Sequence, residues 1–413
     1  MGPYVTLFVL VALLAGLAVG KAWERYKLQD GRWIDRRRAR ESPHYMLGLN
    51  FLVANQIDPA IEELSTAAEA AGDPLEIHLI LGNLYREKGQ VGRAIQQHQA
   101  LLQRPHLRKL EHANVLLCLG LDYKHGGFVD RALEAFVEVL RLDPDNRYAL
   151  SNLEKLHEEQ HQWTEAYGMR QKLAARDAPE QQGRHHQILA FLENEIGLAA
   201  LKRTDYAEAA RRFQAAIELD SRNAPAYLNL GDVHFLQGDA AVASATWEQL
   251  VGTSPDRAYL TFSRLESAYA RLEASSLEPN DAARFPELCR RLIAANPQDW
   301  RARLALARHL TSHGNPHDAL ELLFEALVIN PHALALHQAI WETLSHLKLA
   351  PALVDRYVDL TRDAIFYLDP HICVRCRYRS TELLWQCPHC HEWDTFVEER
   401  IAPAKDTEAT LTS

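Results

Sequence analysis

The sequence predicts a mainly helical protein in three parts: a transmembrane helix, an α-solenoid of about eight to nine repeats, and a small β module that binds a metal. The observations behind this are an uncharged N-terminal segment, a pattern that recurs about every 34 residues, and four cysteines close together near the C-terminus. Of the 413 residues, 47% are hydrophobic and 24% are charged, which is ordinary for a chain that buries a core. The net charge of -10 argues against a general nucleic-acid binder, because phosphate affinity needs clustered lysine and arginine.

The first 20 residues carry no charged side chain, and twenty helical residues rise about 30 Å, the thickness of a bilayer core. Residues 21–40 contain eight Lys or Arg against three Asp or Glu, and positive charge beside a span marks its cytoplasmic side. We therefore expect residues 1–20 to form an uncleaved single span with the N-terminus outside, followed by a basic juxtamembrane segment. The alternative is a cleaved signal peptide, because small residues of the cleavage type precede Lys21.

Residues 41–366 contain a repeated pattern: a Leu-Gly pair, an aromatic residue three positions after the Gly, an alanine at twelve and a large apolar residue at sixteen. In the first copy the last four positions are Gly48, Phe51, Ala60 and Leu64. Later copies are centred on Gly82, Gly120, Leu153, Gly197 and Gly231, with two looser copies near Leu306 and Ile340. The period and the residue types are those of the tetratricopeptide repeat, in which two antiparallel helices form each unit.

Each repeat is expected to pack closely within itself and against its neighbours. Small residues such as Gly48 should let the two helices of one repeat approach, and large residues such as Leu64 should fill the space toward the next repeat. One repeat cannot bury its own apolar face, so several must stack. The spacing is interrupted near residues 105–110, near residues 177–186 and between residues 255 and 300, where we expect insertions or degraded repeats. Such arrays bind peptides or proteins, but the sequence does not single out the contact residues.

Four of the six cysteines lie in two C-x2-C pairs separated by ten residues. They are Cys373, Cys376, Cys387 and Cys390. Two such turns brought together form a tetrahedral cage of four sulfurs, the geometry that Zn²⁺ prefers in structural sites. We expect one metal ion, with zinc favoured and iron also compatible. Disulfides or buried cysteine pairs are the alternative, although thiols stay reduced in a cytoplasm. Cys118 and Cys289 stand alone and are expected to be small buried apolar residues.

The C-terminal module, residues 367–401, is expected to be a rubredoxin-like zinc ribbon. So short a segment cannot hold a core of its own, and the metal must supply its folding energy. Its short strands are predicted at residues 365–368, 382–385 and 393–397. Residues 402–413 are polar and small, and we expect them to be a disordered tail.

Two features of the cysteine turns depart from, or add to, the simplest ribbon. Glycine often follows the second cysteine of such a pair, where the backbone turns left-handed, but this chain has Arg377 and His391 there. A residue other than glycine costs about 1 kcal/mol in that conformation. Trp385 and Trp393 flank the second pair, and they should either cover it or dock the module onto the last repeat.

Residues 157–161, His-Glu-Glu-Gln-His, match the zincin motif, in which two histidines on one helix face bind zinc beside a catalytic glutamate. A zincin also needs a third ligand and a cleft beside a sheet, whereas this motif falls in a repeat helix where His157 should pack inside the solenoid. We therefore predict no catalytic residue and no enzyme. The ribbon itself could instead carry iron and transfer electrons, or bind nucleic acid through Arg375, Arg377 and Arg379, for which a solvated edge is the favoured interpretation.

Three local motifs carry a resemblance to a known family. They are Tyr45-x2-Gly48-x-Asn50-Phe51-Leu52, then Leu79-x-Leu81-Gly82-Asn83-Leu84-Tyr85-Arg86 with Arg93-Ala94-Ile95-x2-His98-Gln99, and finally Cys373-x2-Cys376…Leu384-Trp385-x-Cys387-Pro388-x-Cys390-x2-Trp393. With the anchor and the repeats, they make nearly the whole chain resemble the lipopolysaccharide assembly protein B family of Gram-negative bacteria. Arg377 departs from that family, which tends to have glycine there, and the middle repeats match only as generic repeats.

The resemblance implies an inner-membrane adaptor rather than an enzyme, with a periplasmic N-terminus and with its repeats and C-terminus in the cytoplasm. It further implies that the protein restrains lipopolysaccharide synthesis by presenting the LpxC deacetylase to the membrane protease FtsH, and that a membrane regulator antagonises it. The expected partners are these three proteins and inner-membrane lipid, with no nucleic acid. The four cysteines carry over as ligands of a structural metal ion, and no other residue carries over.

Overall fold

The computed structural model describes most of the chain between residues 42 and 399. The described stretches are residues 42–70, 74–105, 107–275, 283–330, 333–347 and 371–399, with the isolated positions 16, 19 and 21. They fall into two compact units, Met1–Gln160 and His161–Ser413, and each is described by itself. Apart from those isolated positions, the predicted anchor and juxtamembrane segment lie outside the described residues, as do the predicted strand at 365–368 and the tail. No described helix combines the length and the apolar character that a membrane span requires.

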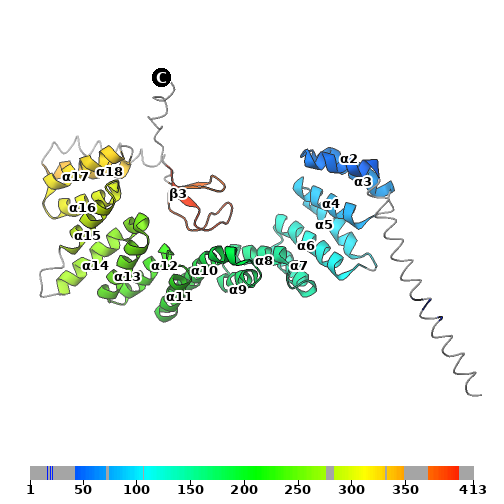
Figure 1. Cartoon of the computed structure of the whole chain (residues 1–413), viewed down its shortest axis with the longest axis horizontal. Helices are drawn as coiled ribbons and strands as arrows, with labels where there is room; N and C mark the ends of the chain where they lie inside the picture. Colours follow the sequence, from blue (N-terminus) through cyan, green and yellow to red (C-terminus); the bar gives the residue numbers. More distant parts are fainter. Residues whose placement is uncertain are drawn as a thin grey trace, which may run out of the picture. The chain divides into compact units, whose positions relative to one another are not determined.

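The first unit is a stack of helices, each packed on the next (Figure 1). Its helices are α2 Pro43–Val53, α3 Ile57–Ala70, α4 Leu75–Glu87, α5 Val91–Leu102, α6 Lys109–His125, α7 Val129–Leu142 and α8 Arg147–Glu159. The pairs α2/α3, α4/α5 and α6/α7 are hairpins of one repeat each. The turn inside each hairpin uses a left-handed residue, namely Asn55, Gly89 or Gly127, with φ of 57°, 77° and 75°. Glycine and asparagine tolerate this conformation best, which is why the sequence ends its helices there.

The second unit continues the same architecture and ends in a small sheet (Figure 1). Its helices are α9 Trp163–Ala174, η1 Pro179–Gln181, α10 Gln182–Lys202, α11 Tyr206–Leu219, α12 Ala224–Leu236, α13 Ala240–Thr253, η2 Pro255–Thr261, α14 Phe262–Ser275, α15 Arg284–Ala295, α16 Trp300–Ser312, α17 Pro316–Ile329 and α18 Leu334–His346. Its strands are β1 His371–Cys373, β2 Arg379–Ser380 and β3 Phe396–Glu398. The sheet order is β2-β1-β3 and both pairings are antiparallel. The predicted mainly helical repeat architecture with a small C-terminal β module is therefore confirmed.

The predicted strands of the β module are only partly correct. The stretch 393–397 overlaps β3, which begins at Phe396. The stretch 382–385 is not a strand, and the second strand lies earlier, at Arg379–Ser380. It is only two residues long, too short to show the alternation on which strand prediction depends.

Close approach of the two helices in a repeat depends on the glycine of the repeat pattern, as predicted. A Cβ built at Gly120 would lie 2.7 Å from Cε1 of Phe136, sixteen residues later, and one built at Gly48 would lie 2.7 Å from Cγ of Leu64. Leu64 also belongs to a buried cluster with Ile77 of the following repeat. The large residue at position sixteen therefore fills two spaces, the one beside its own glycine and the one toward the next repeat.

The second repeat uses a histidine at this position. His98 is fully buried against Gly82, and its Nδ1 lies 2.5 Å from Oδ2 of the buried Asp122. Oδ1 of Asp122 accepts a hydrogen bond of 2.8 Å from Nη1 of Arg86. The network joins α4, α5 and α6, which belong to two successive repeats, and it satisfies both oxygens of a carboxylate that is removed from water.

The interruptions in the repeat spacing are accommodated in different ways. The first lies between α5 and α6, and α6 extends to 17 residues. The second forms η1 and the start of α10, which reaches 21 residues. In the third, where the pattern is degraded, η2, α14 and α15 still contribute Ala258, Phe262 and Phe285 to a shared core. These insertions therefore lengthen or reshape repeats, and the described part of the array continues through them.

The glycine contacts generate a stability prediction. A Cβ at Gly231 would overlap the indole ring of Trp247. We expect Gly231→Ala to lower the urea midpoint of unfolding, because overpacking of a tight core costs about 1–3 kcal/mol. The matched control is Gly252→Ala in α13, where a Cβ would meet nothing within 4 Å. Far-UV circular dichroism measures both variants, and equal midpoints would contradict the need for close approach at Gly231.

The buried network generates a second prediction. Asp122→Ala should reduce stability by about 3–5 kcal/mol, because it leaves His98 and Arg86 without the carboxylate that holds them. Asp58→Ala is the control, since Asp58 pairs with Lys88 on an exposed surface of the same unit and should change little. Urea unfolding measures the free energy of unfolding of both variants. A small effect of Asp122→Ala would show that the network is dispensable for stability.

Candidate metal centre

The four cysteines of the C-terminal module come together around one point. Their Sγ atoms all lie within 4.8 Å of one another. The Cys373–Cys390 distance is 3.8 Å and the Cys376–Cys387 distance is 3.5 Å. A tetrahedral ion with metal–sulfur bonds of about 2.3 Å needs sulfur–sulfur edges of about 3.8 Å, whereas a disulfide would bring two sulfurs to about 2.05 Å. The donor set therefore fits one metal ion, and all four side chains are free thiols.

The two cysteine turns have the same backbone hydrogen bonding. In the first turn, the amide of Arg377 donates to the carbonyl of Cys373 at 2.9 Å, and the amide of Cys373 donates to that of Tyr378 at 2.9 Å. The amide of His391 likewise donates to the carbonyl of Cys387 at 2.9 Å, and the amide of Cys387 to that of Glu392 at 2.9 Å. Two equivalent turns present two sulfurs each, which is how the short spacing produces a four-sulfur cage.

The left-handed backbone expected after each turn is present. Arg377 has a φ of 64° and His391 a φ of 55°. Each residue costs about 1 kcal/mol there relative to glycine. Such conformations persist only where the surrounding structure determines them, and here the cage and the paired hydrogen bonds do so.

The electrostatics of the thiols favour a bound cation. Burial raises the pKa of the Cys373 thiol, but its hydrogen bond with the Thr395 hydroxyl and those with nearby backbone groups outweigh burial and bring the pKa to about 6. Burial also raises the pKa of Cys390, in this case to about 12. Four thiolates this close repel one another, so all four ionise together only around a positive ion, which also deprotonates its ligands.

The apolar cover of the cage comes from within the ribbon. Cys373 and Cys387 pack with Phe396, and Leu383 and Leu384 lie against the same cluster. Phe396 stands opposite Cys373 in the β1–β3 register. This role of Phe396 was not predicted from the sequence, although the strand expected at 393–397 contained the signal.

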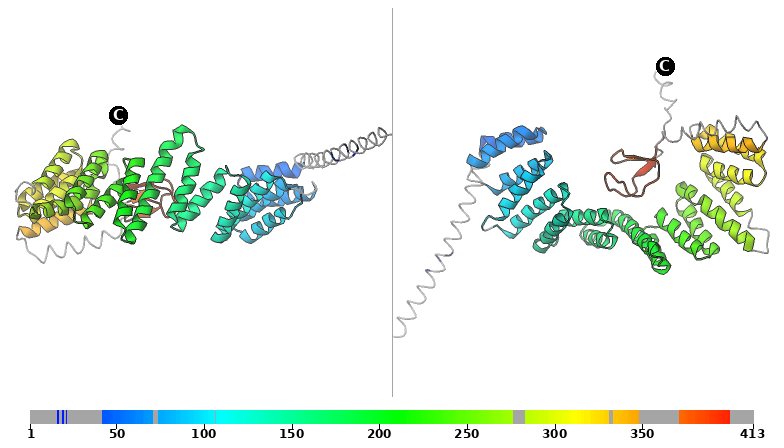
Figure 2. Two further views of the ribbon diagram at one scale, coloured as in Figure 1. Left: turned by 90° about the horizontal axis from the view of Figure 1, so that it is seen from below. Right: turned by 180° about the vertical axis from the view of Figure 1, so that it is seen from behind.

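The two tryptophans dock the ribbon onto the repeats, but not onto the last repeat. Trp393 is 4% exposed and stacks on Phe191 of α10, with ring centroids 5.3 Å apart and planes at 18°. It also contacts Trp163 of α9, with ring centroids 6.4 Å apart. The ring centroids of Trp385 and Phe191 lie 6.4 Å apart, and Trp385 also packs against the core formed by α12 to α16. The alternative that they cover the second cysteine pair is therefore replaced by a docking role. Figure 2 shows the backbone of the ribbon beside the helices of the second unit.

Charged pairs surround this aromatic contact, with arginines on the repeats and acids on the ribbon. Arg184 of α10 lies 3.3 Å from Glu392, and it also donates to the carbonyl of Trp393 at 3.2 Å. The other two pairs are Arg257 of η2 with Asp394 at 2.8 Å and Arg301 of α16 with Glu398 at 2.5 Å. These side chains are partly exposed, so each pair contributes at most about 1 kcal/mol. The buried aromatic contact therefore supplies most of the attraction, and the ion pairs fix the orientation.

The zincin-like motif does not form a metal site. Helix α8 ends at Glu159, and His161 lies beyond it with a φ of 57°. The two histidines are therefore not on one helix face. Within the described ranges, His157 and His161 belong to no group of metal-binding side chains.

The predicted basic patch of the ribbon is partly neutralised. Arg375 pairs with Glu392, and Arg379 lies 2.7 Å from Glu399. Arg377 is exposed on the same turn. Two of the three arginines thus have acidic partners, which weakens the patch as an anion-binding surface.

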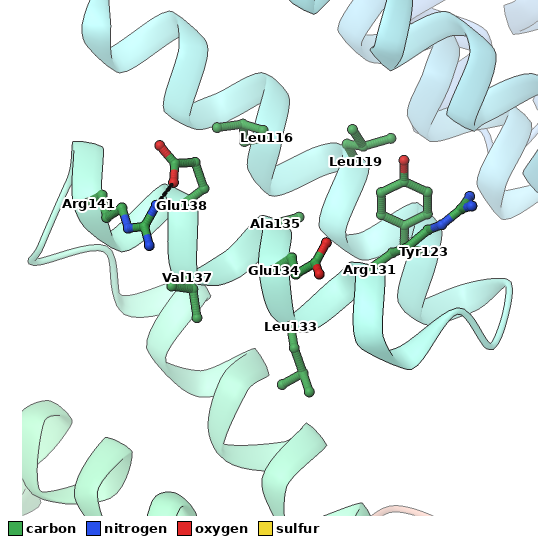
Figure 3. Close-up of a pocket in the computed structure, with 10 residues that line it drawn as sticks. All are labelled: Leu116, Leu119, Tyr123, Arg131, Leu133, Glu134, Ala135, Val137, Glu138 and Arg141. Atoms are coloured by element: carbon green, nitrogen blue, oxygen red, sulfur yellow. Dashed lines mark hydrogen bonds and ion pairs between the residues drawn. The ribbon is translucent and has the colours of Figure 1, made fainter.

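An open groove of about 650 Å³ lies along α6 and α7 of the first unit (Figure 3). Its apolar lining includes Leu116 and Leu119, and its charged lining mixes Arg131, Glu134, Glu138 and Arg141. Arg141 and Glu138 pair with each other at 2.8 Å. The mixture of charges selects no ligand, and the lining contains no metal-binding or nucleophilic cluster.

The cage generates a prediction that separates the ribbon from the repeats. Cys387→Ser should abolish stoichiometric metal binding and unfold the ribbon, because three thiolates and a hydroxyl hold the ion far less well. The repeats should stay helical, since their packing does not involve the cage. Cys118→Ser in α6 is the matched control and should keep the metal. Elemental analysis and circular dichroism check both, and full metal retention by Cys387→Ser would overturn the four-ligand assignment.

Two family models match the two parts of the architecture. The family model described as rubredoxin metal binding domain matches residues 371–398. The tetratricopeptide repeat model matches residues 45–105, 194–258 and 286–333. A solved tetratricopeptide repeat protein from Parabacteroides merdae is 16% identical, covering 75% of this chain and 99% of its own, with a TM-score of 0.34.

Curated relatives cover most of the chain. Lipopolysaccharide assembly protein B of Escherichia coli (strain K12) is 24% identical over 358 residues, which are 86% of this chain and 89% of the relative. The protein of the same name from Haemophilus influenzae is 25% identical over 411 residues, or 94% of this chain and 97% of the relative. These matches confirm the resemblance: the chain is a relative of lipopolysaccharide assembly protein B, a repeat scaffold rather than an enzyme, and it ends in a rubredoxin metal binding domain.

Proposed function

We propose that this protein is an inner-membrane adaptor that restrains lipopolysaccharide synthesis by presenting the LpxC deacetylase to the membrane protease FtsH. The observation that carries the proposal is the similarity to lipopolysaccharide assembly protein B over 86–94% of the chain, together with the repeat and rubredoxin matches found in this chain. Within that framework, the repeats bind the client and the N-terminal segment holds the array at the membrane. A membrane regulator of lipopolysaccharide synthesis acts on the adaptor from the same membrane.

The physical reason for such an adaptor is effective concentration. Holding a client and a protease on one tethered scaffold makes their encounter intramolecular. For short flexible links the effective concentration is on the order of 1 mM. No chemistry by the adaptor is required. Helical repeats suit this task, because a stack of repeats offers an extended surface that small changes in side chains can adapt to a client.

We also propose that the ion in the ribbon is zinc. The four thiol ligands leave no open coordination position, which is typical of structural zinc sites. Iron fits the same ligands, but electron transfer needs a partner site that nothing in the described repeats provides. Bound zinc would supply folding energy to the ribbon, while Trp385, Trp393 and the acids around them dock the folded ribbon on the repeats.

The adaptor function predicts co-purification and a change in client lifetime. Crosslinking of the tagged full-length chain in its native host, followed by purification from solubilised membranes, should recover LpxC and FtsH. Depletion of the chain should lengthen the lifetime of LpxC several-fold, measured after translation is stopped. Expression of the wild-type chain should restore the short lifetime, and Cys387→Ser should not. Recovery of neither protein, with an unchanged LpxC lifetime, would overturn the proposal.

A further inference from the structure

The ribbon contacts the repeats at three places that are far apart in the sequence. Trp393 packs on Phe191 of α10, Asp394 pairs with Arg257 of η2, and Glu398 pairs with Arg301 of α16. These contacts come from a segment of six residues in the ribbon, 393–398. One short segment of the ribbon therefore touches the second unit at α10, at η2 and at α16.

The helix stack alone connects these places only step by step. Helix α10 packs on α9, α11 and α12, and α16 packs on α15, α17 and α18. In a solenoid each repeat contacts its neighbours, so small differences in packing accumulate along the array. The orientation of α16 relative to α10 thus depends on every junction from α11 to α15. A contact that reaches both ends of this stretch removes that accumulated freedom.

The docking segment is coupled directly to the cysteine cage. Phe396 pairs with Cys373 in the sheet register and packs on the cage. The amide of Val374 donates to the carbonyl of Thr395 at 2.9 Å. The amide of Asp394 donates to the carbonyl of Trp385 at 2.7 Å, which links the two docking tryptophans. A metal ion that orders the cage therefore also orders the residues that touch the repeats.

We propose that the metal-bound ribbon is a clamp that fixes the orientation of α16 relative to α10. The aromatic contact with Phe191 holds the ribbon on α10, and the pairs with Arg257 and Arg301 hold it on η2 and α16. Arg301 is itself held in place, since its guanidinium lies 4.3 Å from the ring centroid of Tyr259 and 4.9 Å from that of Trp300. Metal loading then sets the bend of the second unit, and with it the shape of any surface that the unit offers. This inference does not depend on the identity of a client.

The test is a distance distribution between α10 and α16 in the purified full-length chain. His186 of α10 and Arg308 of α16 are both exposed. Donor and acceptor dyes placed there through noncanonical amino acids leave all six cysteines unlabelled. Single-molecule energy transfer then reports the width of the distribution of distances between the two dyes. A change confined to the ribbon, with no effect on the repeats, would leave this width the same.

Variants of the docking residues should change this width in a defined order. Arg301→Glu and Glu398→Arg should each widen the distribution, because like charges then face each other across the contact. The double swap should narrow it again in part, since it restores the attraction but not the stacking of Arg301. Arg379→Glu is the control, because its partner Glu399 lies within the ribbon, and it should leave the width unchanged.

Undocking the ribbon altogether gives the decisive comparison. Trp393→Ala removes the aromatic anchor, whether or not the ribbon keeps its metal, and chelation of the metal removes the folded ribbon. Both should widen the distribution at least as much as Arg301→Glu does. An unchanged width after Trp393→Ala would show that the helix stack alone sets the orientation, and the clamp would be wrong.

Discussion

Burial of one repeat against the next is the constraint on which the rest of this structure depends. Each hairpin of helices leaves an apolar face that it cannot cover itself, and residues such as Leu64 cover it by contacting both their own glycine and the following repeat. The network of His98, Asp122 and Arg86 performs the same function with polar groups, because it joins two repeats and has no exposed carboxylate. Stability is thus built from neighbour contacts, and the array has little long-range rigidity of its own.

The C-terminal ribbon is not stabilised by stacking of neighbouring repeats. It folds around a metal ion and not around a large core, and its buried apolar centre consists of two cysteines and Phe396 with few supporting residues. What it adds to the molecule is contact between distant parts of one unit, from Phe191 to Arg301. A small module can do this because one buried tryptophan provides affinity and a few charged pairs provide orientation.

The features that the sequence predicted well are those that short-range spacing determines. The glycine and the large residue sixteen positions later must meet within one hairpin, so the repeat is visible in a single sequence. The cysteine cage is visible for the same reason, since two sulfurs on a turn require the C-x2-C spacing. Arg377 and His391 could be expected to be left-handed because they follow the second cysteine of each turn.

The features that escaped prediction depend on contacts between distant residues. Phe191 is about 200 positions before Trp393 and looks like any apolar residue of a repeat helix, so the sequence could not show where the ribbon docks. Arg257 and Arg301 look like ordinary solvated charges until the ribbon places acids beside them. The zincin-like motif had been set aside because it lacks a third ligand and a cleft beside a sheet. The structure adds a reason that the spacing could not show, because the helix ends at Glu159, before the second histidine.

Metal binding explains how the ribbon tolerates residues other than glycine in its two cysteine turns. Arg377 and His391 together cost about 2 kcal/mol relative to glycine, at about 1 kcal/mol each, a serious loss for a module with so small a core. Binding of a structural zinc ion contributes about 10–16 kcal/mol in small zinc-dependent domains, which far exceeds that strain. The ligand set therefore determines whether the ribbon folds. The left-handed positions after each cysteine turn do not have to be glycine. The same surplus leaves Asp394 and Glu398 available for docking on the repeats, whereas Glu392 also pairs with Arg375 of the ribbon.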